Sequence, residues 1–118
     1  KVDDELMSDV YFAPGHGEYR KQIRVHSYNV THLFRKESKN HLIEITVANG
    51  WYLGQIGRSN NNYGNQRGLI AELHLTYEEG TRECIATDTS WQYTTDGPVR
   101  YADFYNGEII DRNQMNKS

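Results

Sequence analysis

Hydrophobic and polar residues alternate most regularly over residues 69–77, which predicts a β-strand with one face toward solvent. One face would carry Leu69, Ala71, Leu73, Leu75 and Tyr77, and the other Ile70, Glu72, His74 and Thr76. The alternation stops at residues 78–81, where Gly80 suits the positive φ of a short hairpin loop. Residues 69–91 are therefore predicted to form one long β-hairpin ending at Trp91, which we expect to lie in the core.

Two earlier segments, residues 21–28 and 41–48, also alternate and are predicted to be strands. Between them, residues 29–35 favour one short helical turn capped by Asn29 or Thr31. A last extended segment is predicted over residues 99–110, and the chain then leaves through a tail that includes residues 113–118.

Short strands joined by hairpin turns predict an all-β fold in a single domain over residues 1–118. We expect an antiparallel β-sandwich of jelly-roll (galactose-binding-like) type. Roughly five strands are evident, whereas a closed jelly roll has about eight. We therefore expect its first strands to be missing, leaving an unpaired sheet edge and an exposed apolar strip.

The composition predicts a thin core and excludes several classes of partner. Only 36% of the 118 residues are hydrophobic and the mean hydropathy is −0.84, although 12% aromatic residues argue against disorder. A formal charge of −3 with scattered Lys and Arg predicts no nucleic-acid binding. No apolar run approaches the roughly 20 residues of a membrane span.

Cys84 is the only cysteine, which rules out an internal disulfide and predicts no zinc-type ligand set. We expect its side chain to be small, apolar and buried in the returning strand rather than a reactive thiol. The five histidines show no i, i+4 pairing of the kind that binds metal on a helix, and His26 and His74 are predicted to be exposed.

Over residues 49–68 the alternation stops, and glycines, aromatic residues and side-chain amides predominate. Connections of this length are usually functional or disordered. Aromatic rings stack on the C–H face of a sugar, while amides bind its hydroxyl groups. The candidate carbohydrate-binding residues are Asn49, Trp51, Tyr52, Tyr63 and Asn106. The alternative is that Trp51 packs against the sandwich and the asparagines bond to turn backbone.

Hydrolytic chemistry within the chain is not predicted, and no residue is assigned a catalytic role. An inverting glycosidase needs two carboxyl groups about 6.5–9.5 Å apart. Asp103, Glu108 and Asp111 form the densest acidic group, but on an extended strand Asp103 and Glu108 would lie roughly 16 Å apart on opposite faces. We expect these three carboxylates to be solvent-exposed residues of a strand face or a turn.

Three segments, 49–52, 77–91 and 102–113, together resemble the N-terminal domain of bacterial α-L-rhamnosidases of glycoside hydrolase family 78. They contain, in order, NGWY, YEEGTRECIATDTSW and ADFYNGEIIDRN. The resemblance implies a jelly-roll sandwich, truncated at its start, that precedes a catalytic (α/α)₆ barrel in a larger enzyme. That barrel hydrolyses terminal L-rhamnose by inversion with two acidic residues, and the chain holds none of it.

In some relatives the sandwich is a calcium-dependent rhamnose-binding module, and the candidate calcium ligands here are Asn49, Asp103, Asn106 and Glu108. Two departures from the family pattern weaken that site. His16 stands where an aromatic is frequent, and Asn106 stands where an aspartate is usual. A lost carboxylate lowers affinity for a hard cation.

Three functions remain open at this point. The first is an accessory, non-catalytic domain of an α-L-rhamnosidase, whose partners are the other domains of that enzyme. The second is a stand-alone carbohydrate-binding module for L-rhamnose-containing glycans, with or without calcium. The third is a protein-interaction sandwich with exposed tyrosines as anchors. A secreted bacterial parent would place the chain in the periplasm or outside the cell, and any other parent in the cytoplasm.

Overall fold

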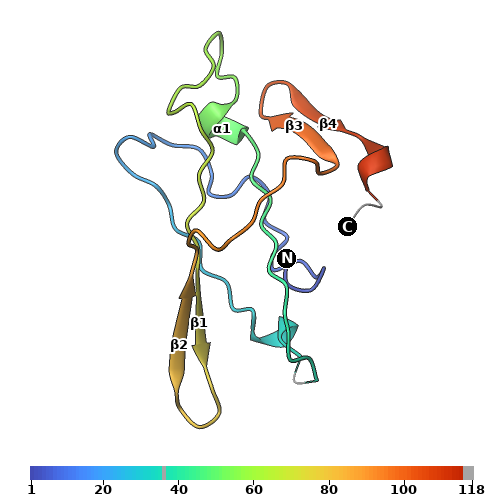
Figure 1. Cartoon of the computed structure of the whole chain (residues 1–118). Helices are drawn as coiled ribbons and strands as arrows, with labels where there is room; N and C mark the ends of the chain where they lie inside the picture. Colours follow the sequence, from blue (N-terminus) through green and yellow to red (C-terminus); the bar gives the residue numbers. More distant parts are fainter. Residues whose placement is uncertain (36, 116–118) are drawn as a thin grey trace.

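The computed structural model describes residues 1–35 and 37–115, and regular structure occupies a small part of them (Figure 1). The strands pair as two antiparallel two-stranded sheets, β1 with β2 and β3 with β4. The elements, in order, are η1 (Thr31–Leu33), α1 (Gly50–Leu53), β1 (Glu72–Thr76), β2 (Arg82–Ala86), β3 (Val99–Asp103), β4 (Gly107–Ile110) and η2 (Arg112–Gln114). The all-β, antiparallel prediction is confirmed and is consistent with a β-sandwich; the jelly-roll topology stays a prediction.

The first hairpin, β1–β2, confirms the alternation seen in the sequence, although the ladder is shorter than residues 69–91. The register pairs Glu72 with Ala86 at one end and Thr76 with Arg82 at the other. Gly80 takes a φ of +91° in the loop and its N–H donates to Tyr77 O at 2.9 Å. Along β1 the leucines are half-buried and the polar residues exposed, as the period of two requires.

The second hairpin, β3–β4, forms where the sequence predicted one extended segment over residues 99–110. The chain turns between Asp103 and Gly107, where Asp103 Oδ1 accepts from Asn106 N–H at 2.5 Å and Gly107 has a φ of +71°. An aspartate at the first turn position and a glycine after it are typical turn chemistry, so the signal was present in the sequence. The predicted exit tail begins with η2, whose Asn113 N–H donates to Asp111 Oδ1 at 3.0 Å.

The strands predicted over residues 21–28 and 41–48 are wrong. Residues 21–28 are irregular, with Ile23 64% and Val25 90% exposed, and residues 41–48 contribute only an isolated bridge between Ile43 and Val2. Alternation alone does not make a strand, because the backbone groups also need a neighbouring strand. The helical turn predicted over residues 29–35 is confirmed as η1, where Asn29 Oδ1 accepts from Thr31 N–H at 3.1 Å.

The buried core of the described residues is very small. Its apolar members are Val2, Leu33 and Leu53. Trp91 is half-buried and Cys84 is exposed, so the prediction that both side chains lie in the core is wrong. Cys84 lies on β2, which contacts β1 and no other described element.

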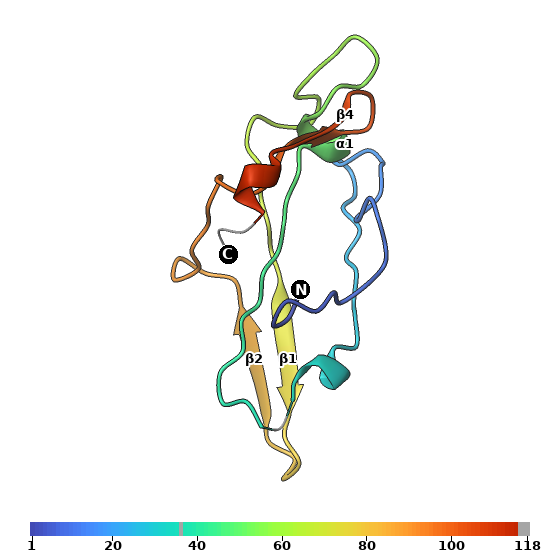
Figure 2. The same cartoon turned by 90° about the vertical axis from the view of Figure 1, so that its right-hand side faces the viewer.

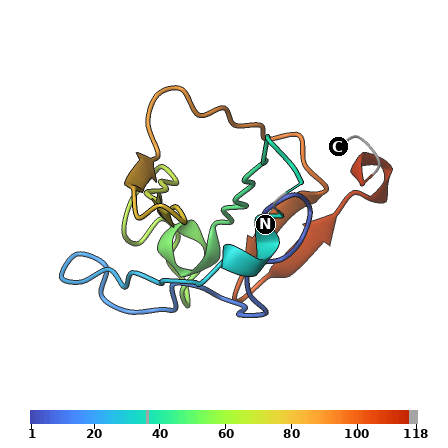
Figure 3. The same cartoon turned by 90° about the horizontal axis from the view of Figure 1, so that it is seen from below.

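The overall shape is open. The two hairpins lie at opposite ends of the molecule (Figures 1 and 2) and on opposite sides when it is viewed along the long axis (Figure 3). The radius of gyration is 16.5 Å, against about 13–14 Å for a compact chain of this length. The accessible surface is 10384 Å², against about 6600 Å² for a folded monomer of this mass.

Exposed apolar surface and unpaired edges are therefore present in the described part of the chain, as the sequence predicted. Each sheet has two strands, so every strand has one free edge. Large apolar side chains at high exposure include Ile70 at 91%, Phe12 at 71% and Ile109 at 61%.

Leu53→Ala and Leu6→Ala remove the same atoms from opposite environments, because Leu53 is 8% exposed and Leu6 is 69% exposed. We expect Leu53→Ala to lower the free energy of unfolding by about 2–4 kcal/mol and Leu6→Ala to change it by less than about 0.5 kcal/mol. Urea unfolding followed by circular dichroism measures both. Equal effects of the two variants would contradict the assignment of the core.

Candidate functional site

The candidate site is built where α1 meets β3, the one contact between a helix and a strand among the described elements. Gly54 ends α1 and is buried, and a Cβ at this position would lie 2.5 Å from Asp103 Cβ. Only glycine therefore allows the helix end to approach the strand so closely. This approach brings the loop of residues 49–68 beside the β3–β4 turn.

A hydrogen-bond network around Asp103 connects the two segments. Asp103 Oδ2 accepts from the backbone N–H of Gln55 at 3.1 Å, from Asn106 Nδ2 at 2.9 Å and from the Tyr101 hydroxyl. Asn106 Nδ2 also donates to Gln55 Oε1 at 2.9 Å. The network joins residues 51 positions apart in the chain, so it fixes the loop against the hairpin.

The Asp103 carboxyl group is strongly acidic. Partial burial raises its pKa, but hydrogen bonds from the Tyr101 hydroxyl, from Asn106 and from the Gln55 N–H outweigh that effect and hold the pKa well below its usual range. The group is therefore ionised at any physiological pH. It is not a general acid, which requires a raised pKa.

One aromatic cluster lies beside this network. The Trp51 ring packs edge-on against Phe104, with centroids 5.6 Å apart, and lies 5.0 Å from the His16 ring. Phe12 packs on Phe104 at 4.8 Å. Trp51 is half-buried, so its ring packs within the domain and is also partly accessible. Sugar binding by Trp51 stays a prediction.

A second aromatic cluster involves the next residue of α1, Tyr52. Tyr52 stacks on Tyr63 with centroids 6.3 Å apart, and Tyr19 meets Tyr63 edge-on at 5.0 Å. The Arg20 guanidinium lies over the Tyr63 ring at 5.7 Å, within the range of a cation–π interaction. Burial raises the pKa of Tyr19, so its hydroxyl stays protonated.

The structure brings together some of the residues predicted for the site. Trp51 and Tyr52 lie on α1, Tyr63 stacks on Tyr52, and Asn106 joins the Asp103 network. Asn49 precedes α1 and its Oδ1 accepts from Arg67 Nη1 at 2.6 Å. The sequence did not single out Phe12, Tyr19 and Phe104, because these residues lie in irregular segments where no periodicity relates them to α1.

The proposed calcium ligands Asn49, Asp103, Asn106 and Glu108 do not present a free set of oxygens in this arrangement. The Asp103 oxygens accept hydrogen bonds from four donor groups, and Asn106 contributes its side-chain nitrogen as a donor. Asn49 Oδ1 accepts from the Arg67 guanidinium. Glu108 is exposed on β4 opposite Ala102. The residues present do not fit a calcium ion without rearrangement, and calcium binding stays a prediction.

Asp103→Asn tests the network through its pH dependence. The folded-state pKa of Asp103 lies below the ordinary value of 3.8, so its stabilisation is complete above that pH and is lost as the pH falls toward the folded value. We expect the variant to melt at a lower temperature at about pH 7, with the difference from wild type shrinking by about pH 3. Glu108→Gln, on the exposed β4, is the matched control and should show no such trend. A difference that is constant with pH would contradict the account.

The model of the α-L-rhamnosidase N-terminal domain family matches residues 2–118. Three α-L-rhamnosidases are similar. That of Formosa agariphila is 32% identical over 93% of this chain and 12% of its own length. That of Alteromonas sp. is 33% identical over 83% and 10%, and that of Streptomyces avermitilis is 35% identical over 84% and 9%.

The chain thus spans about a tenth of the length of the curated relatives that it matches. No solved structure matches it. No described segment is a helix of the length and apolarity needed to cross a membrane. With its family model matched over nearly all residues, the chain belongs to the α-L-rhamnosidase N-terminal domain family.

Proposed function

We propose that this chain is an accessory, non-catalytic domain of an α-L-rhamnosidase that removes terminal non-reducing α-L-rhamnose. The observation that carries the proposal is the accessible surface of 10384 Å², about half as large again as a compact monomer of this mass would expose. A domain that packs against the remaining nine-tenths of such an enzyme would cover this excess.

The acidic residues support a non-catalytic role. The carboxyl groups of Asp3, Asp88 and Asp103 have pKa values shifted downward, each by hydrogen bonds to the ionised form. The general acid of an inverting glycosidase needs a shift in the opposite direction. We expect the isolated chain not to hydrolyse p-nitrophenyl α-L-rhamnoside. Turnover that Glu108→Gln or Asp111→Asn abolishes would overturn the proposal.

The leucine face of β1–β2 is the part of the surface best suited to packing. Leu73 and Leu75 lie on one face of β1, and Ile85, which pairs with Leu73, is 41% exposed. The opposite face carries the polar residues Glu72, His74 and Thr76. Glu83, which pairs with Leu75, is the one charged residue of the two strands on the leucine face. A largely apolar face backed by a polar face is typical of a strand pair that packs on one side only.

Leu73→Glu and Thr76→Glu place the same charge on opposite faces of β1, Leu73 opposite Ile85 and Thr76 opposite Arg82. In the longer rhamnosidase, we expect Leu73→Glu to lower the melting temperature by several degrees, because burying an unpaired carboxylate is costly. Thr76→Glu should leave the melting temperature nearly unchanged. Differential scanning calorimetry of both variants measures this, and equal melting temperatures would reject the packing face.

A second candidate function, carbohydrate binding, is favoured by the aromatic clusters beside the Asp103 network. Flat rings at Trp51 and Tyr63 next to amide donors are the combination that binds sugars. Such binding would be compatible with the accessory role, because the domain would then present substrate to the rest of the enzyme.

Calorimetric titration with L-rhamnose, with and without calcium, tests this second function. If the clusters bind sugar, Trp51→Ala should abolish the heat of binding, while Trp91→Ala, a tryptophan outside both clusters, should retain it. No heat under either condition would reject sugar binding. Heat that requires calcium would support the ligand set Asn49, Asp103, Asn106 and Glu108.

A further inference from the structure

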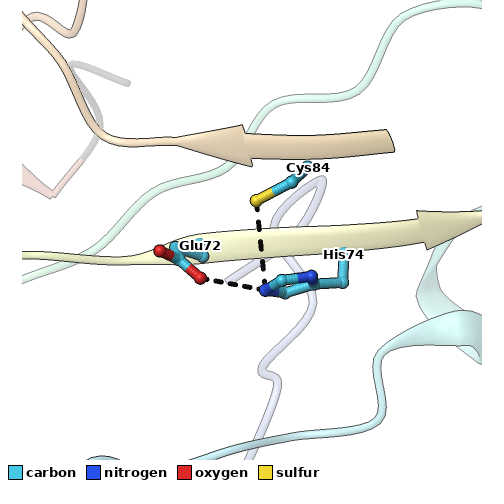
Figure 4. A group of neighbouring side chains, drawn as sticks. All are labelled: Glu72, His74 and Cys84. Carbon is cyan, nitrogen blue, oxygen red and sulfur yellow. Dashed lines mark hydrogen bonds and ion pairs between the residues drawn. The ribbon is translucent and has the colours of Figure 1, made fainter. Parts of the chain in front are cut away.

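Three metal-ligating side chains converge on the solvent face of the β1–β2 hairpin (Figure 4). Glu72 and His74 lie two residues apart on β1, so both point to the same face. Cys84 is the register partner of His74 on β2 and points to that face as well. The donor atoms of all three side chains lie within 4.8 Å of one another.

The separations between the donor atoms suit a small tetrahedral ion. His74 Nε2 lies 2.9 Å from Glu72 Oε2 and 3.9 Å from Cys84 Sγ. Zinc bonds of about 2.0–2.3 Å at tetrahedral angles place pairs of donor atoms roughly 3.3–3.6 Å apart. Shifts of about half an ångström in exposed side chains would therefore bring these two pairs to the tetrahedral separation.

We propose that Glu72, His74 and Cys84 form a binding site for Zn²⁺ or a similar borderline divalent cation. Thiolate, imidazole and carboxylate are the ligand types that zinc takes, and three protein ligands leave the fourth position to water. The site does not depend on the proposed accessory function. It was not evident from the sequence because its histidine and cysteine are ten residues apart and meet only through the hairpin register.

The charges around the site are compatible with a cation. A thiolate and a carboxylate together would neutralise the charge of the ion, and His74 would bind through an unprotonated Nε2 with its proton on Nδ1. Arg82, which pairs with Thr76, is the remaining charged residue of β1 and β2 on this face. Glu83 lies on the opposite face and accepts from the Tyr77 hydroxyl at 2.6 Å.

A bound ion would also link the two strands. An isolated two-stranded hairpin is marginally stable in water, and β1–β2 contacts no other described strand or helix. Ligands contributed by both strands would hold the register between His74 and Cys84. Binding should therefore raise the melting temperature of the hairpin as well as protect the thiol.

Co²⁺ titration of the reduced chain is the direct test, because cobalt replaces zinc and gives a thiolate-to-metal charge-transfer absorption. We expect one ion per chain, displacement by Zn²⁺ and slower alkylation of Cys84 with Zn²⁺ bound. Cys84→Ser should remove the charge-transfer band, and His74→Ala and Cys84→Ser should each weaken binding more than about 100-fold. His26→Ala, an exposed histidine outside the hairpin, and Glu83→Gln, on the opposite face, are the controls and should bind as wild type.

Each alternative outcome has a defined meaning. Binding that survives Cys84→Ser and His74→Ala would overturn the proposal, because the ion would lie elsewhere. The proposal would also be overturned if circular dichroism showed the β structure intact but no charge-transfer band appeared. The three side chains would then be joined by hydrogen bonds only. A variant that loses its β structure is replaced by Cys84→Ala or His74→Gln, and the same readouts then decide.

Discussion

Folded chains must bury apolar side chains to offset the conformational entropy lost on folding, and this chain has few places in which to do so. Its described core is limited to Val2, Leu33 and Leu53, while large apolar residues such as Ile70 remain in solvent. The hairpins have free edges and do not cover one another. The chain spans about a tenth of the length of the curated relatives that it matches. The proposed accessory role would supply the missing cover from surface outside these residues.

Within the chain, the best-defined long-range contact is the approach of α1 to β3. Gly54 allows the backbone to come close to Asp103, and the Asp103 carboxylate then accepts hydrogen bonds from both segments. The cluster of Trp51 and Phe104 depends on this contact, because Phe104 follows Asp103 in the β3–β4 turn. Structure and candidate sugar recognition are thus coupled, because any change that separates α1 from β3 would also move Trp51.

Local patterns in the sequence predicted local structure well. The β1–β2 hairpin and the η1 turn follow from alternation, a loop glycine and the Asn29 side chain. Residues 21–28 and 41–48 alternate as well, but a strand also needs a partner, and the sequence does not reveal whether one is present. Trp51, Tyr52 and Tyr63 were proposed from residue type, and sugar binding by them stays a prediction. The Asp103 network and the Glu72, His74 and Cys84 cluster required knowledge of register and of contacts between distant segments.

Hydrogen–deuterium exchange tests the central claim that outside surface stabilises this domain. The amides of β1 and β2 would be followed in the isolated chain and in a full-length rhamnosidase that contains it. We expect fast exchange in the isolated chain, because an uncovered hairpin opens at little free-energy cost, and strong protection in the longer protein. Equal protection in both would contradict the central claim, because the chain would then be a self-sufficient domain.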